Sequence, residues 1–391
     1  MKVAILTFAV TNNYGATLQC YALQEFLRNQ GHETLILNVP LQKAGGARKV
    51  RTFIDRVKGK LNPLYCMVWG QKEGRYYRSK RESLIDHAFE AANMRLFDMF
   101  RQKYFYSITH PYIIEDDFLK DYPEADAYVV GSDQVWNPWV TNFQYPIFFF
   151  SFVKKGKKIS YAACMGGDRD FEFTNDESTT IKRLINEFDS VSVRDKTAIS
   201  ILKNKFNYQA TEVLDPTFLI DNSLYNRVMG DSNLDAKGSM FCFKFIINDA
   251  WTKVIKEMAS EMKLSIRMDS CVIPIKGLPF QPTCSVADWL KLIKTSEFVF
   301  TDSFHGMVFC ILFRKNFVAT PSYKGGEERY IDLARKFGLE NRVYTSMKDM
   351  VESKKIWMQP INYDDVYRKL EPLRKQSVSF LLNALNNEQY D

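Results

Sequence analysis

Several features that would identify other classes of protein are missing from this sequence of 391 residues. No stretch reaches the roughly 18 consecutive apolar residues that a transmembrane helix requires. No G-x-G-x-x-G motif marks an ordinary dinucleotide-binding domain. The seven cysteines include no C-x-x-C pair, and the four histidines do not cluster with them. We therefore expect no metal site, no cofactor, and reduced thiols in a cytoplasmic protein.

What is present is typical of a folded globular protein. Hydrophobic residues make up 46% of the chain and charged residues 25%, a balance that argues against disorder. At about 100–200 residues per domain, the length favours two domains over one. The apolar start of the chain resembles a signal peptide, but it has no small-residue cleavage site and runs into a turn. We therefore interpret it as a first core strand.

The positive charge is concentrated in one region. The net charge is +7, and residues 41–105 alone contain 15 Lys and Arg against 6 Asp and Glu. This region is either a solvated helical insertion or a basic surface that contacts an anionic membrane or a polyphosphate-bearing substrate. No nucleic-acid-binding motif accompanies the charge, so nucleic acid is not an expected partner.

The order of apolar segments predicts an α/β fold. A strand over 2–7, a helical pattern over 16–30 and a second strand over 33–39 form a β-α-β unit, and the alternation returns after residues 127 and 240. We predict two Rossmann-like domains and a closing helix. Their boundaries are 1–230, with a basic helical insertion over 41–115, then 235–360, then 361–391 for the helix.

The segment around His305 predicts where the chemistry takes place. A buried strand over 298–301 stops abruptly, and an apolar helix follows over 307–313, with His305 and Gly306 between them. Ligands bind at the carboxyl ends of strands in open α/β sheets, so this position favours a functional histidine. The alternative is a core histidine that is hydrogen-bonded to the backbone.

Six short motifs, in order along the chain, resemble those of the polysaccharide pyruvyl transferase family. They are Asn13-Tyr-Gly-Ala-Thr-Leu-Gln-Cys-Tyr-Ala-Leu23, Gly131-Ser-Asp-Gln-Val-Trp-Asn137, Ser160-Tyr-Ala-Ala163, Ser192-Val-Arg-Asp195, Leu214-Asp-Pro-Thr-Phe218 and Thr301-Asp-Ser-Phe-His-Gly306. The resemblance implies two Rossmann-like domains facing each other across a cleft, similar to the GT-B glycosyltransferase architecture. It also implies transfer of the pyruvyl group of phosphoenolpyruvate onto two hydroxyls of a sugar. The product would be a cyclic ketal in a cell-surface polysaccharide or its precursor.

One position departs from the family pattern. Many members have an arginine two residues before the histidine, where this chain has Ser303. If that arginine holds the donor's phosphate or carboxylate, another group must do so here. Two other functions stay open: a glycosyltransferase of the same architecture that uses a nucleotide-sugar donor, and a non-catalytic glycan-binding protein.

Pyruvyl transfer needs a general acid for the methylene of phosphoenolpyruvate and a base for the sugar hydroxyls. His305 is the candidate acid, because a nearby anionic donor would keep an imidazole protonated. Asp133, just after a predicted strand over 127–131, is the candidate base; the alternative is a turn aspartate. Asp215, before a proline, is interpreted as a structural turn residue. Asp302 either orients His305 or caps the following helix, and the cap is the favoured interpretation.

Cations are needed for the donor's carboxylate and phosphate. Arg194 ends a predicted strand, Lys324 lies in a Gly-rich loop that an anion could approach closely, and Arg329 follows that loop. The alternatives are a salt bridge for Arg194, an ordinary loop for Lys324, and a helix cap or surface pair for Arg329. The predicted donor site also includes Ser303 and Gly306.

Acceptor contacts are predicted on the first domain. The first β-α loop and its helix contribute Asn13, Tyr14, Gly15 and Gln19, and the loop after 127–131 contributes Trp136, which would stack on a sugar face. The alternatives are a glycine-assisted turn into a capped helix and a packed tryptophan. The expected acceptor is a sugar or a lipid-linked glycan precursor. The basic 41–105 region would then contact the inner face of the cell membrane.

Overall fold

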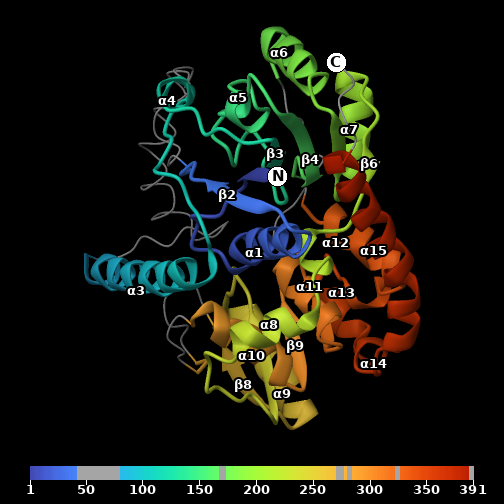
Figure 1. Cartoon of the computed structure of the whole chain (residues 1–391). Helices are drawn as coiled ribbons and strands as arrows, with labels where there is room; N and C mark the ends of the chain where they lie inside the picture. Colours follow the sequence, from blue (N-terminus) through green and yellow to red (C-terminus); the bar gives the residue numbers. More distant parts are fainter. Residues whose placement is uncertain (42–79, 167–172, 270–276, 280–283, 322–325, 387–391) are drawn as a thin grey trace, which may run out of the picture.

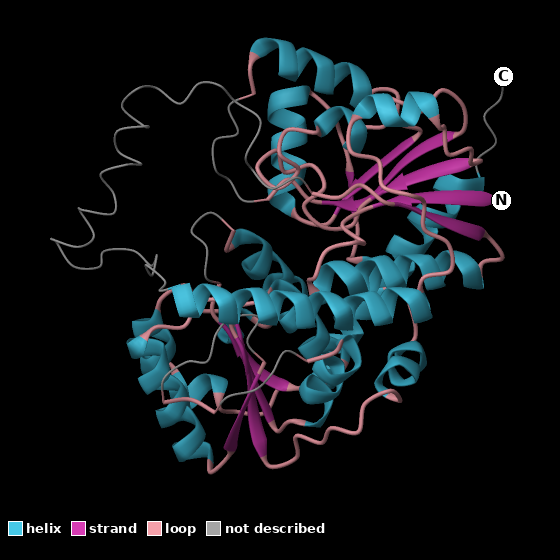
Figure 2. Ribbon diagram, turned by 90° about the vertical axis from the view of Figure 1, so that its left-hand side faces the viewer, coloured by secondary structure: helices cyan, strands magenta, loops and turns pink. Residues whose placement is uncertain are grey.

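The computed structural model describes residues 1–41, 80–166, 173–269, 277–279, 284–321 and 326–386, and only the backbone of 80–90. Two separate parallel sheets with flanking helices are visible in both views (Figures 1 and 2). The predicted α/β fold with two Rossmann-like halves is confirmed.

The N-terminal sheet has six parallel strands in the order β2-β1-β3-β4-β5-β6. Along β1, Val3 and Ile5 enter one core cluster and Ala4 and Leu6 enter another, so apolar side chains cover both faces. Burial on both faces explains the continuous apolar runs in the sequence. The strands are β1 (Lys2–Leu6), β2 (Glu33–Leu37), β3 (Ala127–Val130), β4 (Lys157–Ala163), β5 (Ser190–Val193) and β6 (Thr211–Glu212).

The C-terminal sheet has four parallel strands in the order β10-β9-β7-β8. Its central strand β7 is also buried on both faces, with Met240 and Cys242 in one cluster and Phe241 and Phe243 in another. The strands are β7 (Ser239–Phe243), β8 (Ser265–Met268), β9 (Phe298–Thr301) and β10 (Asn316–Ala319).

Helices connect these strands, and many begin with a side-chain cap. Asn13, Asp195 and Ser303, for example, each accept a backbone N–H from the first turn of the helix that follows. The helices up to residue 229 are α1 (Tyr14–Asn29), α3 (Lys80–Tyr104), α4 (Glu115–Lys120), α5 (Tyr145–Phe148), α6 (Asn175–Ile185), α7 (Lys196–Phe206), the 3-10 turn η1 (Pro216–Phe218) and α8 (Asn222–Met229). The later ones are α9 (Asp249–Met262), α10 (Val286–Thr295), α11 (Phe304–Leu312), α12 (Glu328–Phe337), η2 (Glu340–Arg342), α13 (Met347–Glu352), α14 (Lys354–Trp357) and α15 (Tyr363–Asn386).

The two halves share one core cluster, which contains residues of both sheets. Tyr14, in the first turn of α1, stacks on Trp289 of α10 with ring centres 5.0 Å apart. The last helix, α15, runs from the C-terminal half back to the N-terminal sheet (Figure 1). There the hydroxyl of Ser377 accepts from the backbone N–H of Leu214 at 2.9 Å. The halves therefore pack as one body around the site described below.

The predicted domain limits stay a prediction. Two helices of the predicted first domain, α8 and α3, contact helix α10 of the second half. Helix α3 lies in the predicted basic insertion, whereas residues 42–79 of that insertion lie outside the described residues. Within the described parts of the chain, no helix has the length and apolar character needed to cross a membrane.

Candidate active site

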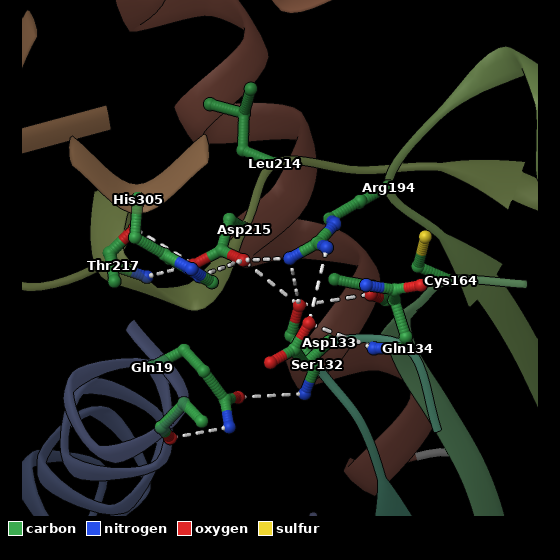
Figure 3. Close-up of polar contacts among 12 residues, drawn as sticks. Gln19, Ser132, Asp133, Gln134, Cys164, Arg194, Leu214, Asp215, Thr217 and His305 are labelled. Atoms are coloured by element: carbon green, nitrogen blue, oxygen red, sulfur yellow. Dashed lines mark hydrogen bonds and ion pairs between the residues drawn. The ribbon is translucent and has the colours of Figure 1, made fainter. Parts of the chain in front are cut away.

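Four segments that are far apart in the sequence bring polar side chains to one place (Figure 3). The loop after β3 contributes Ser132 and Asp133, the end of β5 contributes Arg194, and the segment between β6 and η1 contributes Asp215. His305 comes from the other half, as the second residue of α11 after β9. Most of these residues follow the carboxyl end of a parallel strand, which is the edge where such sheets bind ligands.

Asp215 connects the other members of the group. One carboxylate oxygen accepts from the backbone N–H and the hydroxyl of Thr217, at 3.1 and 2.8 Å. The other oxygen accepts from the Ser132 hydroxyl and from Nη1 of Arg194, both at 2.9 Å. The same oxygen lies 3.5 Å from Nε2 of His305. The predicted turn is present, but its aspartate also joins Arg194 to the histidine.

Asp215 is held as a carboxylate. Burial alone would raise its pKa, but the interactions with His305 and Arg194 hold that pKa well below its ordinary value. The 3.5 Å distance to His305 is long for a hydrogen bond, so this contact is mainly electrostatic. A carboxylate placed there can orient the imidazole and stabilise an imidazolium.

The His305 ring lies against the first turn of α1, in the other half of the molecule. A Cβ atom on Gly15 would come within 2.1 Å of Nδ1 of His305. Any larger residue at position 15 would therefore push the ring or separate the two helices. This close approach explains why position 15 is a glycine, and no contact between Gly15 and an acceptor is needed to explain it.

Arg194 is buried and paired. Its Nη2 lies 3.4 Å from Oδ1 of Asp133, and its guanidinium carbon lies 4.4 Å from the centre of the Phe304 ring. With the Asp215 contact, the guanidinium has two carboxylate neighbours, and the side chain is only 2% exposed. The salt bridge that was one interpretation of Arg194 is observed, and it faces the histidine of the other half.

Asp133 lies at the more accessible side of the group. Its side chain is 16% exposed, compared with 2% for Asp215. Its backbone has a φ of 73°, in the left-handed region that aspartate tolerates better than most residues, and Oδ1 also accepts from the N–H of Gln134 at 2.9 Å. Among these carboxylates, Asp133 is thus better placed than Asp215 to meet a ligand.

The chain matches a known family over most of its length. A model of the polysaccharide pyruvyl transferase family matches residues 13–322, a range that includes every residue of the site described above. The chain belongs to this family. The resemblance that the six motifs predicted is therefore confirmed, and the protein is a transferase of this class.

The transferase is also similar to solved structures, at low sequence identity. The S. aureus MnaA–UDP co-structure is 12% identical, with a TM-score of 0.49 over 100% of this chain and 99% of that one. UDP-GlcNAc 2-epimerase from Neisseria meningitidis bound to UDP-GlcNAc is 10% identical, with a TM-score of 0.48 over 98% and 100%. Spinosyn rhamnosyltransferase SpnG is 11% identical, with a TM-score of 0.46 over 99% and 100%. Similarities this distant identify neither donor nor acceptor, and no curated protein matches the chain.

Two residues predicted to contact the acceptor are packed inside the transferase. Tyr14 is 2% exposed, and its hydroxyl donates to the carbonyl of Cys284 at 2.7 Å. Trp136 is also 2% exposed; its Nε1 donates to the carbonyl of Phe148, and its ring stacks on Phe149 at 4.7 Å. These contacts contradict the predicted sugar stacking by Trp136 and make Tyr14 a link between the halves.

Gln19 is completely buried and holds two loops together. Its amide nitrogen donates to the Thr7 hydroxyl and the Ala16 carbonyl, both at 2.8 Å, and its oxygen accepts from the N–H of Ser132 at 3.0 Å. The predicted contact with an acceptor is therefore replaced by a bond that positions the Ser132 loop. Asn13 is exposed and caps α1, as its alternative interpretation stated.

The residues around His305 differ from their predicted roles. Ser303 caps α11, because its hydroxyl accepts from the N–H of Gly306 at 3.1 Å. The predicted cap, Asp302, instead accepts from the N–H of Phe245 at 2.8 Å, so that prediction was wrong. Lys324 lies outside the described residues.

Arg329, near the start of α12, lies beside the site. Its guanidinium carbon is 5.8 Å from the centre of the Phe304 ring, and together with Arg194, Asp215 and Lys336 it lines a small hollow. Arg194 and Arg329 thus line the same hollow, and their predicted contact with the donor stays a prediction.

Three residues of the site were missed at the level of sequence. Ser132 and Phe304 lie inside the family motifs, so those motifs carried the signal. Lys336 lies in an ordinary amphipathic helix and had none; its Nζ donates to the carbonyl of Arg194 at 2.9 Å. Among the described residues, no group of three His, Cys, Asp or Glu side chains is placed to hold a metal ion. The arrangement therefore offers proton transfer and anion binding from its own side chains.

Proposed function

We propose that this chain transfers the pyruvyl group of phosphoenolpyruvate onto two hydroxyls of a sugar in a cell-surface polysaccharide or its precursor, forming a cyclic ketal. Family membership over residues 13–322 supports the reaction class. The observation that carries the proposal is the position of His305, which lies 3.5 Å from Asp215 at the junction of the two halves and beside a hollow lined by arginines. A proton donor next to cations is what an anionic enol ester requires.

The proposed mechanism begins with proton transfer. His305 in its protonated form gives its proton to the methylene carbon of phosphoenolpyruvate, and the adjacent carbon becomes electrophilic. A sugar hydroxyl forms a C–O bond to that carbon, and its proton passes by way of a base back to replace the one that His305 gave. Asp215 stabilises the imidazolium before the transfer and holds the ring in place.

The second half of the reaction closes the ketal. A second hydroxyl forms a C–O bond to the same carbon while the bond from that carbon to the phosphate oxygen breaks. The proton of this hydroxyl leaves with the phosphate. Asp133 is the proposed base for the hydroxyls, because it is the more exposed carboxylate beside Arg194.

The experiment that tests this function is phosphate release from phosphoenolpyruvate by the purified full-length protein, supplied with candidate glycan acceptors. Calorimetric titration with phosphoenolpyruvate and with uridine diphosphate accompanies it, so that donor binding is measured independently of the acceptor. Specific binding of phosphoenolpyruvate supports pyruvyl transfer. Binding of uridine diphosphate alone would reject it in favour of a glycosyltransferase that uses a nucleotide sugar.

We also propose a lipid-linked acceptor and a cytoplasmic location next to the inner face of the membrane. The excess of Lys and Arg over residues 41–105 supports this, because basic segments bind anionic lipid surfaces. Charge reversal of Lys49, Arg51, Arg56 and Lys58 should weaken sedimentation with anionic vesicles. Unchanged sedimentation would reject the membrane contact.

A further inference from the structure

The Phe304 ring lies near two guanidinium groups. The guanidinium carbon of Arg194 is 4.4 Å from the ring centre, and that of Arg329 is 5.8 Å away. Arg194 comes from the N-terminal sheet and Arg329 from α12 in the C-terminal half. The hollow between these side chains is also lined by Asp215 and Lys336. Two halves of the molecule therefore contribute cations to one small space beside His305.

The cations of this hollow differ in how their charge is balanced. Arg194 has Asp215 at 2.9 Å and Asp133 at 3.4 Å. Lys336 has Glu212 at 2.6 Å and Asp332 at 2.9 Å. In the parts of the chain that the structure describes, no carboxylate lies within ion-pair distance of Arg329, and its Nε is buried without a hydrogen-bond partner. Asp195 also lines the hollow, and its buried Oδ2 has no hydrogen-bond partner. Arg329 is therefore the cation of this hollow that no described carboxylate pairs with.

Position 303 supplies no competing cation. The Ser303 hydroxyl caps α11, so the helix that carries His305 brings no positive side chain of its own before the histidine. A guanidinium has five N–H donors in a planar fork that matches a carboxylate or a phosphate. Arg329 interacts with the neighbouring Tyr330 but has no carboxylate partner among the described residues. A guanidinium of this kind, with a buried Nε and facing a hollow, is suited to an oxyanion.

We propose that Arg329 is the principal oxyanion-binding residue of the donor site, and that Arg194 acts mainly by holding Asp215 and the Phe304 ring in place. This inference rests on the proposed function for the identity of the donor, but not for the existence of the anion site. The main contact with the donor is thus assigned to the half-buried Arg329 and not to the buried Arg194, which is already paired with carboxylates.

The test is calorimetric titration of the full-length protein with phosphoenolpyruvate, inorganic phosphate and pyruvate. Arg329→Gln removes the charge, and Arg329→Lys keeps the charge but loses the fork. Arg335→Gln is the matched control, because Arg335 is an exposed arginine on the same helix. Thermal unfolding of each variant shows whether the fold is retained.

We expect Arg329→Gln to weaken phosphoenolpyruvate binding roughly ten- to one-hundred-fold, as for the loss of charged hydrogen bonds. Arg329→Lys should be intermediate, and Arg335→Gln should bind as the wild type does. The simpler probe that loses affinity in Arg329→Gln, phosphate or pyruvate, identifies the group that Arg329 binds. Equal affinity of Arg329→Gln and wild type for all three probes would overturn the inference.

The two proposals fail in different ways. If the wild type does not bind phosphoenolpyruvate but binds phosphate through Arg329, the anion site stands and the donor is wrong. If phosphoenolpyruvate binds equally well to wild type and Arg329→Gln, the proposed function stands and the role of Arg329 is wrong. If none of the three probes binds the wild type, the anion site is rejected.

Discussion

The two halves of this protein each carry a buried cation–carboxylate pair at the carboxyl edge of the sheet. In the N-terminal half the pair is Arg194 and Asp215, with 2.9 Å between Nη1 and Oδ2 and 2% exposure of each side chain. In the C-terminal half it is Lys244 and Asp302, with 3.5 Å between Nζ and Oδ2 and exposures of 1% and 0%. Burial and charge alone do not distinguish one pair from the other.

The neighbours of each pair separate them. Lys244 donates to the Thr320 hydroxyl at 2.8 Å and lies 4.2 Å from the centre of the Trp251 ring, all within the C-terminal half. Asp215, in contrast, faces His305 from the other half of the molecule. The Lys244–Asp302 pair is therefore enclosed within the C-terminal half, whereas the Arg194–Asp215 pair lies at the junction of the halves and next to a hollow. A buried ion pair thus indicates function only when a reactive group and accessible space lie beside it.

His305→Gln should produce the largest effect, because it removes the group that makes the N-terminal pair different. We expect turnover to fall about 100- to 10,000-fold, the usual contribution of general acid–base catalysis, while phosphoenolpyruvate binding persists. Phosphate release measures turnover, and calorimetry measures binding. His110→Gln is the control, because His110 is an exposed histidine whose ion-pair partner is Asp121. Wild-type turnover in His305→Gln would reject the assignment of the general acid.

Removing the cation of each pair should also distinguish the two pairs by their effect on turnover. Arg194→Met and Lys244→Met each leave a buried carboxylate without its cation, which costs about 3–5 kcal/mol of stability. The folded fraction of Lys244→Met should retain turnover, whereas Arg194→Met should lose it, because only Arg194 holds Asp215 beside His305. Urea unfolding gives the stability of each variant. Loss of turnover in folded Lys244→Met would mean that the Lys244–Asp302 pair also serves the site.

A third buried carboxylate, Asp269, sharpens the contrast, because no cation among the described residues pairs with it. Asp269, after β8, is 0% exposed, and in the described parts of the chain no Lys, Arg or His lies within ion-pair distance of it. Burial raises its pKa to about 7, and polar contacts with the Tyr14 hydroxyl and the N–H of Cys284 only partly oppose this. The pKa of Asp215 moves in the opposite direction because its neighbours are positively charged.

The raised pKa predicts a pH dependence of stability. Between the unfolded pKa of about 4 and the folded value of about 7, the folded state holds a proton on Asp269 that the unfolded state has lost. The contribution of Asp269 to stability is therefore complete below pH 4 and is lost as pH rises to about 7, at up to roughly 1.4 kcal/mol per pH unit. Asp269→Asn should lack this slope in urea unfolding measured from pH 4 to 8. A wild-type slope that persists in the variant would assign it to another group.

The fold could be predicted because its signals are local and repeated. Continuous apolar runs such as 127–131 and 298–301 mark strands that are buried on both faces. The family motifs put Asp133, Arg194 and His305 just after strands, at the carboxyl edges of the two sheets. The roles of Tyr14, Gln19 and Trp136 could not be predicted in this way. Each has a polar end that suits a ligand equally well, and only the packing shows that a backbone group already occupies it. Charge balance, which distinguishes Arg329 from Arg194, also depends on contacts between segments distant in sequence.

The smallest expected effect concerns Ser303, the residue that precedes α11. Asp302, of the Lys244–Asp302 pair, and His305, beside the Arg194–Asp215 pair, lie on either side of it in the sequence, so its role decides whether this short segment is structural or contacts the donor. The structure shows its hydroxyl as the cap of α11, and removing such a cap costs about 1 kcal/mol. Ser303→Ala should therefore lower stability by that amount in urea unfolding and leave phosphoenolpyruvate affinity unchanged in calorimetry. Ser303→Asp, which can also cap a helix, should restore stability. It would also place a negative charge next to Phe304, whose ring Arg194 and Arg329 approach, and so weaken donor binding. If Ser303→Ala instead lowered donor affinity while stability stayed the same, the hydroxyl would contact the donor directly, and the original prediction for this residue would hold over the cap.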